Sequence, residues 1–202
     1  MYIIGVTGGV GCGKSEVLRY LSEKWGVRIL QLDLIGHSLL EPDSPCYKRI
    51  ADLFGPAAVN ADGTLNRGVI GESVFHDEAM RQALDDILHP AIRKKTDAIL
   101  KQLREEGVPA AAVEAALLLE AKYDAICDET WYIYADESVR TGRLILSRGY
   151  SEERIRGMMA AQMKEEEFRA ACSFVIDNSG AFERTERQID GRMRDILHKI
   201  KE

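Results

Sequence analysis

A glycine-rich segment directly after a short apolar run limits what this chain can fold into more than any other feature. The segment Gly8 to Ser15 reads GGVGCGKS and follows the apolar run Tyr2 to Val6. Glycines let the backbone turn its N–H groups inward, a lysine supplies a mobile cation, and a serine hydroxyl can hold a metal ion. A helix beginning near Lys14 adds its positive dipole end. The pattern therefore predicts a strand, a phosphate-binding loop and a helix, in preference to a glycine-rich turn without a ligand.

The composition is that of a globular chain, with 202 residues, 46% hydrophobic residues and a net charge of −6. The negative charge argues against the broad basic surface that nucleic acid requires. No run of eighteen apolar residues and no basic leader is present, so we expect no membrane span, no signal peptide and a cytoplasmic location.

The cysteines lack the spacing of metal ligands and are expected to be reduced thiols; they are Cys12, Cys46, Cys127 and Cys172. Cys12 alone has a second interpretation, because a thiol in an anion-binding loop can acquire a lowered pKa and react with oxidants. The favoured interpretation is a small residue that fills space.

Alternating apolar runs and helical patterns predict a parallel α/β sheet. The expected strands are 2–6, 27–32, 109–113, 131–135 and 174–176, and the expected helices are 14–25, 67–106 with a break at His89-Pro90, one from the N-cap Ser151 to about Gln162, and 181–200. Asp33 directly follows the second strand. Ligands bind at the carboxyl edge of such sheets, so Asp33 is expected to face the phosphate loop.

The loop alone predicts nucleotide binding and leaves the reaction open. No Asn-Lys-x-Asp element is present, as a GTPase would need, and Leu117 to Glu120 only loosely imitates the metal-holding strand of a motor ATPase. Asp33 and an arginine-rich segment suit a small-molecule kinase, in which a carboxylate takes the proton of the acceptor and cations offset the phosphoryl charge. Asp33 could instead cap a helix, and the arginines could form a solvated helix face; they are Arg140, Arg143, Arg148, Arg154 and Arg156.

The chain resembles the dephospho-coenzyme A kinase family. The matching elements, in the family's order, are Gly5 to Ser15, Asp33, Asp62-Gly63 with Arg67, Leu88-His89-Pro90, Leu117 to Glu120, Gln162, and Val175 to Gly180. They cover nearly the whole chain, and the His-Pro and Ile-Asp-Asn-Ser-Gly elements are more specific than the loop itself.

This resemblance implies a three-layer P-loop kinase fold with a five-stranded parallel sheet, a helical substrate lobe and a mobile lid. We expect one domain with a nucleotide-binding core at about 1–58, 108–137 and 164–202, a helical coenzyme-binding insertion at about 59–107 and a lid at about 138–163. The implied activity is transfer of the ATP γ-phosphate to the ribose 3′-hydroxyl of dephospho-coenzyme A, with Mg²⁺. A monomer or weak homo-oligomer is expected.

The resemblance also implies roles for residues at matching positions. Asp33 is the expected base, Lys14 and Arg140 act on the phosphates, and Ser15 holds Mg²⁺. The expected ATP contacts are Gly9, Val10, Gly11, Cys12, Gly13, Lys14, Ser15, Glu16, Arg143, Arg148 and Asn178. The expected substrate contacts are Thr7, Asp33, Arg67, His89 and Glu120. For His89, a hydrogen-bonding role at a helix end before Pro90 is an equal alternative.

Three departures from the family pattern are visible. Gln31 stands where the family has the first acid of Asp-x-Asp, Glu16 replaces a hydroxyl residue after Ser15, and Ala116 to Glu120 lacks the proline and phenylalanine of the family element. Two alternatives therefore stay open: a kinase for another hydroxyl acceptor, and a nucleotide-binding regulatory protein without transferase activity.

Overall fold

The computed structural model describes residues 1–201, which form two compact units. Residues 1–30 and the chain from residue 103 onward form the first, here called the sheet unit, and residues 31–102 form the second, the helical unit. Each is described by itself.

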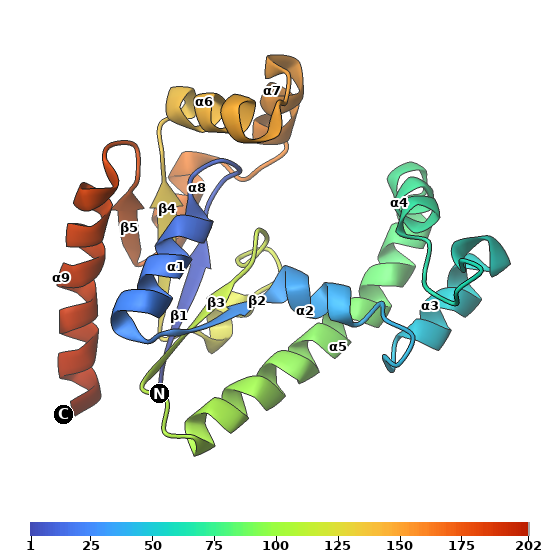
Figure 1. Ribbon diagram of the computed structural model, residues 1–202, viewed down its shortest axis with the longest axis horizontal. Coiled ribbons are helices and arrows are strands. Elements are labelled where there is room, and N and C mark those ends of the chain that lie inside the picture. Colours follow the sequence, from blue (N-terminus) through green and yellow to red (C-terminus); the bar gives the residue numbers. More distant parts are fainter. Residues whose placement is uncertain (202) are drawn as a thin grey trace. The chain divides into compact units, whose positions relative to one another are not determined.

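The elements follow one another along the chain as a mixed α/β series (Figure 1). The strands are β1 (Tyr2–Thr7), β2 (Arg28–Gln31), β3 (Ala110–Glu114), β4 (Glu129–Tyr134) and β5 (Phe174–Asp177). The α-helices are α1 (Lys14–Trp25), α2 (Leu32–Ser38), α3 (Tyr47–Phe54), α4 (Arg67–His76), α5 (Glu78–Glu105), α6 (Glu137–Arg148), α7 (Glu152–Ala160), α8 (Glu165–Ala171) and α9 (Phe182–Lys201). Two 3₁₀ turns are η1 (Pro56–Ala58) and η2 (Tyr123–Ile126).

The sheet has the strand order β2-β3-β1-β4-β5, with β1 parallel to both β3 and β4 and β4 parallel to β5. Gly5 in β1 is in register with Val113 on one side and Thr130 on the other, so the strand that leads into the glycine-rich loop is the central one. The five-stranded parallel sheet expected from the sequence is confirmed. Its carboxyl edge carries the loop after β1.

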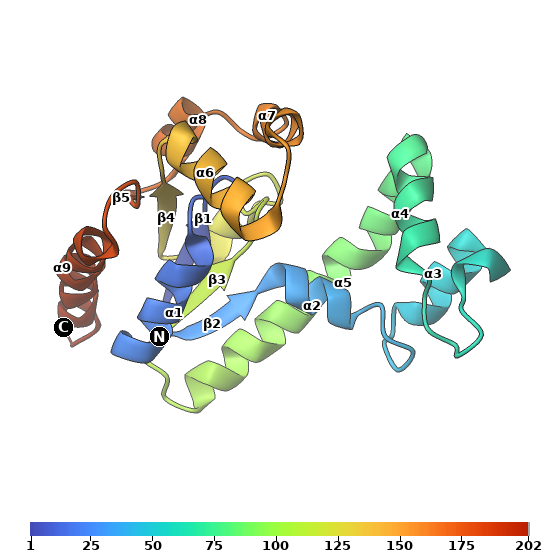
Figure 2. The same cartoon turned by 45° about the horizontal axis from the view of Figure 1, so that its top comes forward.

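Alternate residues of β4 face two different layers of helices. Trp131 and Ile133 are fully buried in a cluster with apolar residues of α1 and α9, whereas Tyr132 packs on the other face against Phe168 of α8. Figure 1 shows α1 and α9 on one side of the sheet and α8 on the other. Helices α6 and α7 lie beyond the carboxyl ends of the strands (Figure 2). The three layers thus follow from the two-residue period of the strand.

An ion pair between a buried carboxylate and a partly exposed arginine joins the amino end of β4 to α9. The Glu129 carboxylate accepts hydrogen bonds from Arg192 Nε at 2.7 Å, from Trp131 Nε1 at 2.6 Å and from the Tyr2 hydroxyl at 3.2 Å. Burial alone would raise the pKa of Glu129, but these hydrogen bonds and the charge of Arg192 lower it overall. The pair fastens the last helix of the chain to the sheet.

The helical unit has a core of its own. Leu39, Ile50, Ile70 and Ile87 are buried together with neighbouring apolar side chains of α3, α4 and α5. Asn66 caps α4 by accepting hydrogen bonds from the backbone N–H groups of residues 68 and 69. The views of Figures 1 and 2 agree that α5 runs beside α2, where the Ile92 side chain lies 3.3 Å from the position of a Cβ on Gly36.

The predicted break at His89-Pro90 is wrong, because α5 runs through Pro90 without interruption. Proline removes only one backbone hydrogen bond, the one to the carbonyl of Asp86, and buried neighbours such as Ile87 hold both halves of the helix to the same core. The actual break between α4 and α5 is at Asp77, whose side chain accepts from the backbone N–H groups of Ala79 and Met80.

One expected boundary also shifts. Strand β2 ends at Gln31, and Asp33 lies in the first turn of α2 instead of directly after a strand. The helical unit begins at residue 31, and Leu39 after α2 and residues of α3 contribute to its apolar core. The predicted division into core, insertion and lid remains a prediction. Among the described residues, no helix combines the length and apolarity that a bilayer crossing needs.

Candidate active site

The loop between β1 and α1 has a backbone that only glycine adopts easily. Gly8, Gly11 and Gly13 have φ values of 151°, 77° and 90°. A Cβ on Gly8 would lie 2.5 Å from the Ile133 carbonyl oxygen, and one on Gly13 would lie 2.3 Å from Asn178 Nδ2. The glycines are therefore required both by conformation and by the close approach of neighbouring groups.

The loop presents backbone donors at the start of a helix. Across residues 1–201, no hydrogen bond engages the backbone N–H groups of Gly13 and Ser15, whereas the Lys14 N–H faces the Cys12 sulfur, and the N-terminus of α1 has no side-chain cap. These unpaired donors, together with the positive end of the α1 dipole, form a site for an anion. A polyphosphate fits this arrangement of groups.

Lys14 lies between the loop and a carboxylate. Its Nζ donates to the Gly8 carbonyl oxygen at 2.8 Å and is 3.9 Å from Glu114 Oε1. Glu114 is buried at the carboxyl end of β3, beside β1. This places an acid at the end of an apolar strand next to the phosphate loop, which is where P-loop enzymes hold their metal-binding carboxylate.

The underside of the loop is supported by buried polar groups. Asn178 Nδ2 donates to the Cys12 carbonyl oxygen at 2.8 Å, and Asn178 Oδ1 accepts from the Thr185 hydroxyl at 2.8 Å. Arg143 donates to the carbonyl oxygens of Cys12 and Asn178 at 3.3 and 2.8 Å. Asn178 is fully buried with both ends of its amide engaged, so it supports the loop in this structure, and its predicted contact with ATP remains a prediction.

The upper side of the loop is crossed by Arg140 of α6. Arg140 Nε donates to the Val10 carbonyl oxygen at 2.8 Å, and its Nη2 donates to Gln162 Oε1 at 3.0 Å. The Val10 N–H also donates to Gln162 Oε1, at 3.0 Å. A Cβ on Gly9 would lie 2.5 Å from Arg140 Nη2, so the guanidinium rests directly on the loop.

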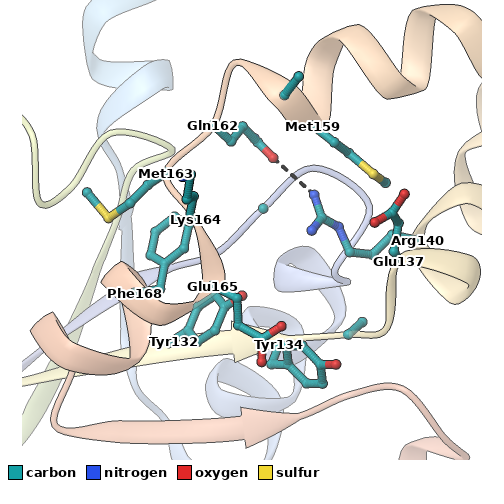
Figure 3. Close-up of a pocket in the computed structure, with 13 residues that line it drawn as sticks. Tyr132, Tyr134, Glu137, Arg140, Met159, Gln162, Met163, Lys164, Glu165 and Phe168 are labelled. Carbon is teal, nitrogen blue, oxygen red and sulfur yellow. Dashed lines mark hydrogen bonds between the residues drawn. The ribbon is translucent and has the colours of Figure 1, made fainter.

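A cavity of about 320 Å³ adjoins the loop at Gly9 and Arg140 (Figure 3). Tyr132 and Phe168 stack in parallel at one wall, with ring centroids 4.7 Å apart, while Met159 and Met163 come from the chain around α7 and α8. The hydrogen bond to Asp136, together with burial, raises the pKa of Tyr134 to about 12, so this phenol stays neutral near pH 7. The cavity combines flat apolar walls with a cationic and an amide group at its rim.

The other predicted ATP contacts differ in exposure and in their neighbours. Ser15 is exposed in the first turn of α1, and Glu16 beside it is exposed and 4.0 Å from Arg19. Arg148 is the last residue of α6, where its guanidinium lies over the ring of Tyr150 at 5.9 Å. No described contact brings Arg148 to the loop.

Cys12 is 1% exposed, and burial raises the pKa of its thiol despite the nearby cations. The reactive thiolate considered from the sequence is therefore wrong, and the space-filling interpretation fits. Thr7, a predicted substrate contact, is also fully buried at the end of β1, and its hydroxyl has no hydrogen-bond partner among the described residues. Glu120 is exposed in the turn after β3.

The predicted residues of the helical unit are exposed. Asp33 is the second residue of α2, and no hydrogen bond or ion pair with another residue of 1–201 engages its carboxylate. Arg67 pairs with Glu41 at 3.0 Å, and His89 Nε2 is 3.7 Å from Asp85 Oδ1. His89 lies inside α5, so the helix-end role considered for it is wrong.

Sequence reasoning missed Glu114 and Gln162 as site residues. It compared only Leu117 to Glu120, which forms turns, with the metal-holding strand of an ATPase, whereas the apolar run that ends in an acid is Ala110 to Glu114. The strand at 109–113 was expected, but no role was assigned to the acid that ends it. Gln162 was named among the elements that match the family but was given no role, because a single glutamine after a helix has many possible roles.

No group of three or more His, Cys, Asp or Glu side chains that could hold a metal ion occurs within residues 1–201. Mg²⁺ does not need such a cage, since it is usually bound by one or two protein groups together with substrate phosphates and water. Ser15 and the carboxylate of Glu114 are the donors near the loop that fit such a metal ion.

Comparison with known proteins gives one family. The family described as Dephospho-CoA kinase matches residues 2–184. A dephospho-CoA kinase of Symbiobacterium thermophilum is 38% identical over 194 residues, covering 96% of this chain and 81% of the relative. A dephospho-CoA kinase of Geobacter sulfurreducens is 37% identical over 190 residues, covering 94% and 96%.

Solved structures agree with the fold. A crystal structure of a Thermus thermophilus protein superposes with a TM-score of 0.81 at 30% identity, covering 96% of this chain and 97% of that one. Dephospho-CoA kinase from Campylobacter jejuni has a TM-score of 0.72 at 23% identity and covers 96% of each chain, which supports the fold alone. With its family match over residues 2–184 and full-length relatives above 30% identity, this chain belongs to the dephospho-CoA kinase family.

Proposed function

We propose that this protein transfers the γ-phosphoryl group of ATP to the ribose 3′-hydroxyl of dephospho-coenzyme A, giving coenzyme A and ADP. The observation that carries the proposal is the anion site at the start of α1, with unpaired N–H groups of Gly13 and Ser15 and with the Arg140 guanidinium against Gly9 and Val10 of the same loop. Membership in the dephospho-CoA kinase family supplies the acceptor.

Different residues of the chain have different roles in the in-line displacement. Asp33 takes the proton as the 3′-oxygen bonds to the γ-phosphorus and the bond to the bridging oxygen of ADP breaks. The loop N–H groups and Lys14 bind the β- and γ-phosphates, and Arg140 offsets charge on the transferring group. Lys14 Nζ spends one of its three donors on the Gly8 carbonyl oxygen at 2.8 Å, which leaves two for phosphate oxygens.

Mg²⁺, held through Ser15 with Glu114 nearby, would neutralise charge on the phosphate oxygens.

The remaining predicted contacts belong to the two units. In the helical unit, Arg67 and His89 bind the coenzyme substrate. In the sheet unit, Arg143 and Asn178 hold the backbone of the loop in its conformation. The cytoplasmic location and the monomeric or weakly oligomeric state remain predictions.

One assay tests the activity. The protein is incubated with ATP, Mg²⁺ and dephospho-coenzyme A, and coenzyme A and ADP are detected by mass. We expect both products in equal amounts and neither when the acceptor or the metal ion is omitted. A panel of other hydroxyl acceptors is run in parallel. Turnover of another acceptor with none of dephospho-coenzyme A, or saturable ATP binding without any phosphorylated product, contradicts the proposal.

A further inference from the structure

Gln162 joins the chain between α7 and α8 to the phosphate loop through a single atom. Its Oε1 accepts from the Val10 N–H and from Arg140 Nη2, each at 3.0 Å. Arg140 Nε in turn donates to the Val10 carbonyl oxygen at 2.8 Å. The three residues thus form a closed ring of hydrogen bonds that engages both backbone groups of Val10.

The ring fixes which way the Gln162 amide points. Both of its neighbours in the ring are donors, so the oxygen must face them and the NH₂ group must face elsewhere. Figure 3 shows the oxygen of Gln162 directed at Arg140 beside the cavity. Gln162 lines that cavity, and its NH₂ group has no partner among residues 1–201.

The ring also decides where the Arg140 guanidinium lies. Arginine is a long side chain with many rotamers, and an unheld one must be ordered when the phosphoryl group arrives. Here two hydrogen bonds, through Nε and Nη2, hold it against Gly9, where a Cβ would lie 2.5 Å from Nη2. Nη1 has no hydrogen bond within the described chain, so its donors remain available to a ligand.

We propose that Gln162 is a positioning residue for phosphoryl transfer, which keeps the Arg140 guanidinium over Gly9 and Val10 so that its remaining donors meet the transferring group without rearrangement. The inference rests on the proposed function, because it assigns to Gln162 the placement of a group that acts in that reaction. A donor that is already oriented costs no reorganisation during the chemical step, and for this reason the expected effect is on kcat.

A double-mutant cycle on kcat tests the proposal. Gln162→Met removes the shared acceptor, and we expect kcat to fall about 10- to 100-fold, below the roughly 100- to 1,000-fold loss that follows removal of a positioned donor in Arg140→Ala. The KM for ATP stays within about threefold, because the loop N–H groups that bind phosphate are untouched. In the Arg140→Ala background, Gln162→Met has nothing left to position and lowers kcat by no more than about twofold.

Two further variants separate positioning from folding. Gln162→Asn keeps the amide but is one methylene shorter, so it cannot reach both donors, and we expect it to lower kcat at least about tenfold. Gln82→Met, on the exposed face of α5 in the helical unit, is the matched control and keeps the wild-type kcat. Melting temperatures of all variants show that the protein is folded at the assay temperature.

Each outcome has one meaning. Wild-type kcat in Gln162→Met or Gln162→Asn, or losses that multiply in the double variant, overturns the positioning role. Absence of coenzyme A formation by the wild-type protein contradicts the proposed function instead, and the cycle is then measured with whichever acceptor of the panel is phosphorylated.

Discussion

The phosphate loop and the predicted substrate residues of the helical unit are held in different ways. Around the loop, the side chains of Lys14, Arg140, Arg143 and Asn178 all donate to backbone carbonyls of the loop or of the turn that supports it. In the helical unit, Arg67 makes an exposed ion pair with Glu41, which is typically worth less than about 1 kcal/mol, and the exposed His89 lies 3.7 Å from Asp85 Oδ1. The loop side chains are thus fixed by hydrogen bonds to the backbone, whereas the predicted substrate residues of the helical unit are held only by exposed side-chain contacts.

The largest expected effect is that of Asp33→Asn, which removes the proposed base while leaving the loop intact. We expect kcat to fall roughly 100- to 10,000-fold, the usual range for a positioned base, with ATP affinity unchanged. Initial rates of coenzyme A formation and an ATP titration measure the two quantities. A near-normal rate would remove Asp33 from the mechanism and leave the helical unit without a catalytic residue.

A second prediction concerns the sheet unit, where a buried carboxylate pairs with a partly exposed arginine. Glu129→Gln removes the charge of the carboxylate while Arg192 keeps Asp195 at 3.8 Å, and hydrogen bonds to charged groups typically contribute about 1.5–3 kcal/mol of unfolding free energy. Urea unfolding of the wild-type and variant proteins at pH 7 measures the loss. Equal unfolding free energies would show that the pair contributes nothing.

The same pair gives a pH dependence with a defined sign. Because the pKa of Glu129 is lowered in the folded protein, its stabilisation is complete above the unfolded value of about 4.3 and is lost as pH falls through the lower folded value. The difference in unfolding free energy between the wild-type protein and Glu129→Gln should therefore become smaller below about pH 4. A difference that stays constant down to about pH 3 contradicts the assignment of this stabilisation to Glu129.

A smaller effect is expected in the helical unit from Arg67→Ala. If Arg67 binds an anionic part of the coenzyme substrate, the variant raises the KM for dephospho-coenzyme A about tenfold, equivalent to roughly 1.4 kcal/mol, and leaves kcat unchanged. Glu41→Gln breaks the same ion pair without removing the arginine and is the control. An equal rise in KM for both variants would mean that the ion pair, and not the charge of Arg67, matters.

The smallest effect concerns Pro90 inside α5. Pro90→Ala restores a backbone hydrogen bond, and a gain of even 1 kcal/mol raises the melting temperature of a chain this long by about 2–4 °C. Calorimetry measures this shift. An unchanged or lower melting temperature would show that the helix is already adapted to proline here.

The sequence predicted the sheet unit well because its signals are local and covalently close. A glycine-rich loop between an apolar strand and a helix that stops before Gly26 is recognisable from neighbouring residues alone. Strands rich in aromatic residues, such as β4, are equally clear. The continuous α5 was missed, because the cost of Pro90 is met by packing that involves distant helices. Gln162 and Glu114 were missed for a similar reason: their partners Val10 and Lys14 are far away in the chain.

The support of the loop by Asn178 has a consequence for biosynthesis. The loop lies near residue 10, yet its underside is completed by a side chain 166 positions later than Cys12. During most of translation the nascent chain therefore contains the glycine loop without the Asn178 side chain that supports it. Binding of ATP to a completed loop can stabilise the fold only after β5 and the residues beyond it have left the ribosome. Polypeptides released early, before residue 178, should be unable to capture the nucleotide.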